Sequence, residues 1–200
     1  IRSQSGDVYI NKISNYCMVD VTAVSGDFLL AHSTLKRVQA DLKSGDIVIS
    51  NTSANVFHVN GHSGMLDSND VDAKEEISYH TISGNMELEN INTKNFFVDT
   101  KSGKIAVNGL TSENIDLVTD TGLMLLNNLT GSGNIKSDMG KINLSLAEKS
   151  KFNLSIQSKV GNISVNVPPA IFFKFKINTK KIGPTDFPLD AIIYGNDDYD

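Results

Sequence analysis

The residues of this chain that could carry out chemistry are few, and three of its four histidines, His58, His62 and His80, are expected on one polar face. If the chain folds into β-strands stacked about 4.8 Å apart, His80 comes to lie beside Asp99 and diagonally across from His62. Imidazole and carboxylate groups are ligands that transition metals accept in proteins. These positions therefore predict a candidate metal site formed by His62, His80 and Asp99.

Two other interpretations of the same residues stay open. In a polysaccharide-processing enzyme built on a β-helix, His80 and Asp99 would act as acid and base towards a bound glycan. Such a site normally also offers a dense set of charged groups and aromatic platforms, and this chain has no Trp. The plainest interpretation is a solvated polar face on which the histidines have no special role. We favour it, and predict no enzyme, no catalytic residue and no cofactor.

Calcium binding is a weaker hypothesis. Calcium takes six to eight oxygen ligands, and glycine-rich calcium-binding repeats present a carboxylate in turn after turn. Here the equivalent position holds Asp7, Asp27 and Asp46 but then Met65. Phosphate-binding loops, nucleophile elbows and zinc-type cysteine spacings are absent from the sequence. The aspartates are therefore interpreted as turn residues.

The elements that position these side chains follow from an internal repeat. A small residue and a glycine recur every 18 to 21 residues, and an alternating apolar stretch follows each glycine. Glycine supplies the backbone conformation of a tight corner, so each repeat predicts one coil. The nine corner glycines are Gly6, Gly26, Gly45, Gly64, Gly84, Gly103, Gly122, Gly140 and Gly161.

Alignment on these glycines brings apolar residues into columns two and four positions after the glycine and five and seven positions before it. A spacing of two is typical of strands, so each coil is predicted to hold two short strands. Asparagine is frequent five or six residues after the glycine, as at Asn51 and Asn90, and predicts a second corner. The predicted fold is all-β: a single-domain β-solenoid, a right-handed parallel β-helix, of about nine coils of ~19 residues.

The repeat ends near Pro168, because proline cannot donate to a sheet ladder. We therefore expect the repeat array to cover residues 1–168. A C-terminal strand and a capping tail are expected in residues 169–200, where they would shield the open end of the stack.

Composition limits the partners. The net charge of −5 and the scattered basic residues argue against nucleic acid. No apolar run is long enough for a membrane span, and the single Cys17 excludes an internal disulfide. Because the sequence begins at Ile1 rather than Met, we expect an upstream signal or anchor outside it.

An outward-facing column three residues after the glycine is unusually apolar. It holds Tyr9, Leu29, Val48 and, further on, Leu125. Such a stripe is either covered by another part of the protein or forms an interaction surface. We favour coverage and keep these four residues as a candidate interaction surface.

The repeat resembles a bacterial family. Its motif is Ser-Gly-Asp followed by alternating apolar residues, with Thr or Ser three positions before the glycine, as in Thr81, Thr100, Thr119, Ser137 and Ser158. The chain is similar in this to the bacterial adhesin-type β-solenoids, also called domain of unknown function 4097. The resemblance covers residues 1–168. It implies an extracytoplasmic domain at the cell envelope or surface, commonly following an anchor, and it brings no catalytic motif.

The first functional hypothesis is thus a non-enzymatic binding or scaffold domain that presents repeated side chains to a cell-wall polymer, a glycan or a protein. The alternatives are the metal-binding or carbohydrate-active face described above, and a module for self-assembly or spacing.

Overall fold

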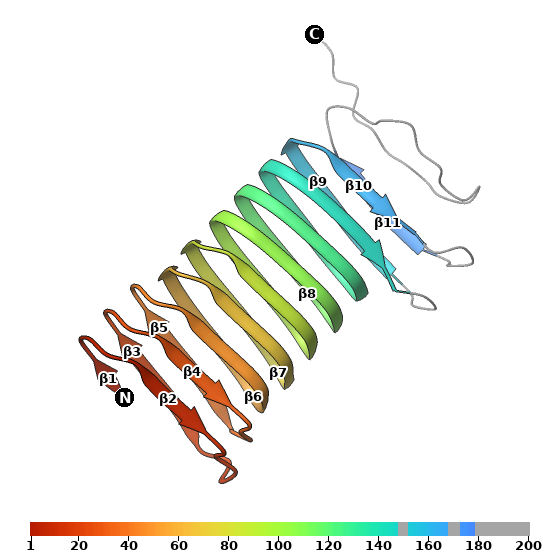
Figure 1. Ribbon diagram of the computed structural model, residues 1–200. Helices are drawn as coiled ribbons and strands as arrows, with labels where there is room; N and C mark the ends of the chain where they lie inside the picture. The colour runs from red at the N-terminus through yellow and green to blue at the C-terminus, as the bar shows by residue number, and fades with distance from the viewer. Residues whose placement is uncertain (148–151, 168–172, 179–200) are drawn as a thin grey trace.

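A computed structural model describes residues 1–147, 152–167 and 173–178 and places them in a regular stack of coils (Figure 1). The coils are joined by parallel pairing throughout and make about eight turns. The predicted all-β solenoid is therefore confirmed, with nine corner glycines delimiting about eight full turns. Its handedness stays a prediction.

The longer strands curve with the coils and are not confined to one side of a coil. β6, β7 and β8 continue as strands through the corners, with register shifts between Ala54 and Val56 and between Asp72 and Glu76, and β8 alone extends over several coils (Figure 1). The elements are β1 (Arg2–Ser3), β2 (Val8–Asn11), β3 (Met18–Ala23), β4 (Phe28–Ala31), β5 (Arg37–Leu42), β6 (Ile47–Ser63), β7 (Leu66–Ser83), β8 (Met86–Leu146), β9 (Phe152–Val160), β10 (Ile163–Asn166) and β11 (Phe173–Asn178).

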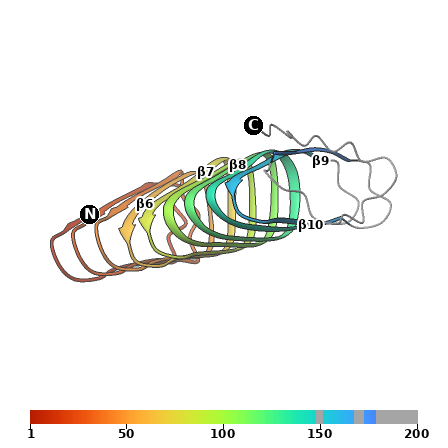
Figure 2. The ribbon, with the colours of Figure 1, turned by 90° about the horizontal axis from the view of Figure 1, so that it is seen from above.

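Each coil has three sides, which we name by their place relative to the corner glycine. The pre-glycine side holds the strand before it, as in β3 and β5, and the post-glycine side holds the strand after it, as in β2 and β4. The short side is the segment from six to ten residues after the glycine, before the next pre-glycine strand. Seen from above, the coils enclose one interior along a common axis (Figure 2).

The register of the stack places equivalent residues of successive coils next to one another. Val19 pairs with Val38, which pairs with Phe57, then with Ile77 and Phe96. All five side chains are buried, as the alternation of a strand with one face inward requires. The same holds for the other three predicted apolar columns within the described coils, apart from the half-buried Ile163 and Val165. Ile1 is a further exception: it lies at the open end of the first coil and is 62% exposed.

One polar pair is enclosed in this core. Tyr79 stands in an apolar column, is 1% exposed and meets the ring of Phe96 edge to face, with centroids 6.3 Å apart. Its hydroxyl lies 2.8 Å from the hydroxyl of Ser68, which occupies the column opposite. The serine that interrupts the apolar column is thereby explained, because a buried hydroxyl needs a partner.

The glycine corner is required by stacking as well as by backbone conformation. Gly64 has φ +117°, and a Cβ on it would collide with the carbonyl oxygen of Gly45 in the preceding coil. No L-residue with a side chain fits this corner without the coils moving apart. The glycine column is thus the line along which neighbouring backbones approach most closely.

The second corner lies one residue later than part of the asparagine pattern predicts. The left-handed backbone conformation falls six residues after the glycine, and at Asn51, Asn90 and Asn128 the expected residue type adopts it. In the first two coils Lys12 and His32 take this conformation instead. The preceding asparagines, Asn11, Asn69, Asn108 and Asn127, are therefore not the left-handed residues of their corners.

The hydroxyl column three residues before the glycine is internal. Thr81, Thr100, Thr119, Ser137 and Ser158 are each at most 2% exposed. Thr81 donates to the Thr100 hydroxyl at 2.9 Å, and Thr100 donates onward to the carbonyl of Ser102 at 3.1 Å. These side chains consequently support the interior of the solenoid and are not available to a ligand.

At the C-terminal end, β11 pairs in parallel with β9, so that Phe173 is the register partner of Phe152. The backbone of 173–178 thus adds to the same sheet. The expected division at residue 168 stays a prediction, and the expected capping tail falls on residues 179–200, which lie outside the described residues.

Candidate binding face

The predicted site residues lie on the outer face of the pre-glycine side, where alternate side chains of each strand point away from the core. The register places Asn60 beside His80 and His80 beside Asp99. One column over, His58, Ser78 and Phe97 are neighbours in the same way. The sequence-based placement of these residues on one outward face is therefore correct.

His80 and Asp99 form a hydrogen-bonded pair. The imidazole Nδ1 lies 3.0 Å from the Asp99 Oδ2, and the two side chains are 38% and 56% exposed. Contact with water at this level keeps the strength of such a pair below about 1 kcal/mol. The pair can therefore exchange its internal contact for one with a ligand at small cost.

His62 does not join this pair. His62 lies in the coil before that of His80, at the strand position equivalent to Ile82, which is two residues beyond His80. Its side chain is exposed. Within residues 1–147, 152–167 and 173–178, no group of three His, Cys, Asp or Glu side chains is placed to hold a metal ion. The candidate metal set His62, His80 and Asp99 therefore supplies two neighbouring groups rather than three converging ones.

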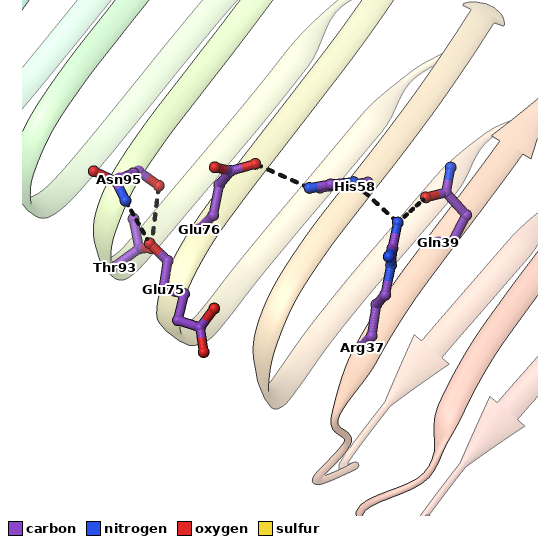
Figure 3. A network of polar contacts seen from close by, with 7 residues as sticks. All are labelled: Arg37, Gln39, His58, Glu75, Glu76, Thr93 and Asn95. Atoms are coloured by element: carbon purple, nitrogen blue, oxygen red, sulfur yellow. Dashed lines mark hydrogen bonds and ion pairs between the residues drawn. The ribbon is translucent and has the colours of Figure 1, made fainter.

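A second histidine on the face has its proton position determined by its neighbours (Figure 3). The Nη2 of Arg37 lies 3.3 Å from Nδ1 of His58, and the Nε2 of His58 lies 2.9 Å from Oε1 of Glu76. A guanidinium can only donate, so Nδ1 must accept and the ring proton sits on Nε2, which donates to Glu76. His58 thus links three coils.

Arg37 also connects His58 and Glu76 to other polar side chains of the face. Its Nη2 also donates to Oε1 of Gln39 at 3.1 Å (Figure 3). The Gln39 amide donates in turn to Oδ2 of Asp41 at 3.0 Å. Asn60 of the next coil donates to the other oxygen of Asp41. These bonds hold the side chains in fixed positions, which lowers the entropy lost when a ligand binds to them.

A further row of bonds lies where the short side turns into the pre-glycine side (Figure 3). The Asn95 amide donates to the backbone carbonyl of Glu75 at 3.0 Å, and Thr93 donates to the carbonyl of Asn95 at 3.2 Å. Asn114 of the following coil donates to the Asn95 side-chain oxygen at 2.8 Å. This edge of the face is therefore also held in position.

The Ser-Gly-Asp motif is structural in all three positions. Asp27 and Asp46 each accept the backbone N–H of the equivalent residue one coil later, at 2.8 Å and 2.7 Å. Ser44 donates its hydroxyl to the carbonyl of Val24 in the preceding coil at 3.0 Å. The carboxylates point along the stack into these backbone bonds, which join successive coils and so differ from the bonds within one turn that the sequence interpretation implied.

The candidate apolar surface divides into two parts. Tyr9, Leu29 and Val48 are in register on the post-glycine side, with Tyr9 68% exposed and the other two half-buried. The next two positions in that column are Asp67 and Glu87. Leu125, also half-buried, therefore lies apart from the other three, beyond a charged stretch.

The carboxylates of that charged stretch lie close enough together to shift the pKa of Asp67. Partial burial raises the pKa of Asp67 above its usual value, and the carboxylates of Glu87 and Glu89 raise it further. A like charge on a neighbouring strand destabilises the ionised form. An anionic ligand is accordingly disfavoured on this part of the post-glycine side.

Sequence reasoning missed the short side. Eight residues after the glycine stands a column of small polar residues, in which Thr34 is bridged to Ser53 and Ser53 pairs with Asp72. Two open hollows border this column, one near His32 and Asp72 and one further along the stack. The sequence does contain a signal for this side, because the position eight residues after the glycine is polar in seven successive repeats. These residues are Ser14, Thr34, Ser53, Asp72, Asn92, Thr111 and Thr130.

In the part of the chain that the structure covers, no helix is long and apolar enough to cross a membrane. A comparison with family models matches residues 1–64 and residues 49–182 to the family described as Toastrack DUF4097. No curated protein and no solved structure matches the chain.

Proposed function

The chain belongs to the Toastrack DUF4097 family, and we propose that it acts as a non-catalytic binding module whose ligand is an extended glycan. The outer face of the pre-glycine side is the proposed contact surface. We place the module at the cell envelope or surface in an adhesin-type role, as the sequence resemblance implies. A cell fractionation that finds the protein only in the cytosol would contradict this location.

One observation carries the proposal. Phe97 is 37% exposed on this face with Ser78 as its register neighbour, and Asp99, two residues along the same strand, is bonded to His80. An aromatic ring with polar groups beside it suits a sugar, whose ring offers an apolar face and hydroxyls at its rim. Three coils back on the same face, Arg37 and Asp41 hold further polar side chains in hydrogen bonds.

The repeat itself favours an extended ligand. Equivalent outward side chains recur at the strand spacing of about 4.8 Å, so a linear polymer lying along the axis meets similar groups coil after coil. Weak contacts then add up along the chain, and no enclosed pocket is needed.

The experiment is retention of the purified chain on immobilised cell-wall and polysaccharide fractions. We expect specific retention of the wild type and at least tenfold weaker retention of Phe97→Ala, which corresponds to about 1.4 kcal/mol. Tyr9→Ala is the matched control, because it removes an exposed aromatic ring from the post-glycine side. Equal losses in both variants, or retention on no fraction, would contradict the proposal.

A further inference from the structure

The short side carries a groove that is separate from the pre-glycine face. It is an open hollow of about 700 Å³ that extends across four successive coils from Ala73 to Ser132. At the strand spacing, four coils place the first and last about 14 Å apart along the axis. The groove therefore suits a linear ligand rather than a compact one.

The floor of the groove is made by small residues nine positions after the corner glycine. These are Ala73, Thr93, Ser112 and Gly131, and a Cβ on Gly131 would collide with the Ser112 carbonyl. Thr93 and Ser112 are 6% and 5% exposed, and each donates its hydroxyl proton to a backbone carbonyl. Each hydroxyl oxygen keeps its lone pairs, so the floor offers acceptors to hydroxyl groups of a ligand.

The walls add charge. Lys74 and Lys94 line the groove together with the single carboxylate of Glu113. Neither ammonium takes part in an ion pair among the described residues; Lys74 lies 5.7 Å from the ring centre of Tyr16. The lining of the groove therefore carries two cations against one anion, and the carboxylate of Asp72 lies beside Asn92 at its first coil.

The neighbouring hollow differs from the groove in charge. It is lined by His32, Asp70 and Asp72 among hydroxyl side chains, and its two carboxylates oppose an anion. A negatively charged ligand is thereby directed away from this hollow and towards Lys74 and Lys94.

We propose that this groove is a second binding site, for an acidic oligosaccharide that lies along the solenoid axis. Its carboxylates face Lys74 and Lys94, and its hydroxyls face the floor oxygens of Thr93 and Ser112 and the exposed side chains of Asn92 and Thr111. The site rests on different residues from the proposed pre-glycine face, so either can fail without the other.

The test uses oligogalacturonate and its fully methyl-esterified form, which have the same sugar backbone and differ in charge. Titration calorimetry on the full chain should show binding of the acidic form, at least tenfold weaker binding of the ester, and weakening of the acidic form by added salt. Lys74→Glu/Lys94→Glu should lower the affinity for the acidic form at least tenfold. Lys12→Glu/Lys141→Glu makes the same charge change at exposed positions outside both proposed sites and should alter it less than twofold.

Equal affinity of the wild type and Lys74→Glu/Lys94→Glu for the acidic form would overturn the proposal, as would equal affinity for the two forms or no binding in the millimolar range. Loss of binding in Phe97→Ala but not in the lysine variant would move the ligand to the pre-glycine face, which would overturn this inference and support the proposed function. Unchanged thermal unfolding of each variant checks that the fold is retained.

Discussion

Replacement of Gly64 by alanine tests the packing argument for the glycine corner. At φ +117° an L-residue is strained by about 1–2 kcal/mol. The new Cβ would also collide with the Gly45 carbonyl oxygen and lie 3.2 Å from Oδ1 of Asp46. Overpacking of this kind costs about 1–3 kcal/mol, so the expected loss of unfolding free energy is about 2–5 kcal/mol.

The chain offers a matched control in the same coil. Gly61 does not have a positive φ, and a Cβ on it would meet only Thr81 and Ile47 side-chain atoms, at 3.6 Å and 3.7 Å. Those are ordinary contact distances. Gly61→Ala should therefore be neutral or stabilise by about 0.4–1 kcal/mol through the unfolded chain.

The assay is urea unfolding followed by far-ultraviolet circular dichroism. Because stacked repeats need not unfold in one step, amide hydrogen exchange of the coils around Gly64 should accompany it. We expect a lower midpoint and local loss of protection for Gly64→Ala only. Equal midpoints for the Gly64 and Gly61 variants would refute the reasoning that inter-coil contact determines the glycine column.

Four further predictions concern hydrogen-bonded groups. Ser68→Ala should lower the unfolding free energy by about 1–3 kcal/mol by leaving the buried Tyr79 hydroxyl unpaired, whereas adding Tyr79→Phe should recover most of the loss; additive losses in a double-mutant cycle would contradict this. Burial raises the pKa of Tyr79, so the neutral form stabilises the fold below the unfolded tyrosine pKa of about 10, and this stability is lost as the pH rises above it. In alkaline unfolding, the wild type should therefore lose stability more steeply than Tyr79→Phe, and parallel curves would count against it. Asp46→Ala should cost about 1 kcal/mol by removing the acceptor of the next coil's backbone N–H, and Asp46→Asn should cost less because it keeps an oxygen there; equal urea midpoints of the two variants would argue otherwise. The hydrogen bond from Lys159 holds the pKa of Asp138 below its usual value, so Lys159→Ala should raise that pKa in an NMR titration. The small stabilisation from this exposed pair is present above the unfolded pKa and is lost as the pH falls. An unchanged titration would refute the assignment.

The sequence predicted the solenoid and its core because each coil repeats the same local rules. Val38 and Phe57 differ in size but occupy the same column, and their apolar character at a spacing of two is visible without coordinates. The outward face of His80 and Asp99 followed from the same alternation once the period was known.

Other features depend on contacts between coils, which a single repeat does not reveal. The aspartate of the Ser-Gly-Asp motif was interpreted as a turn residue, but its partner, the N–H of Met65 in the case of Asp46, lies in the next coil. His62 differs from His80 by two positions along the strand, and this offset separates side chains that share a face. The groove arises from four small floor residues between polar walls, a shape that no one repeat contains.

The central claim is that the pre-glycine face binds a glycan, and chemical-shift mapping tests it most directly. A polysaccharide fragment from the retained fraction would be titrated into isotope-labelled protein while backbone amide signals are followed. The account predicts shifts concentrated at Ser78, His80, Phe97 and Asp99, with little change at Tyr9. Shifts confined to the post-glycine side, or to the short-side groove alone, would contradict it.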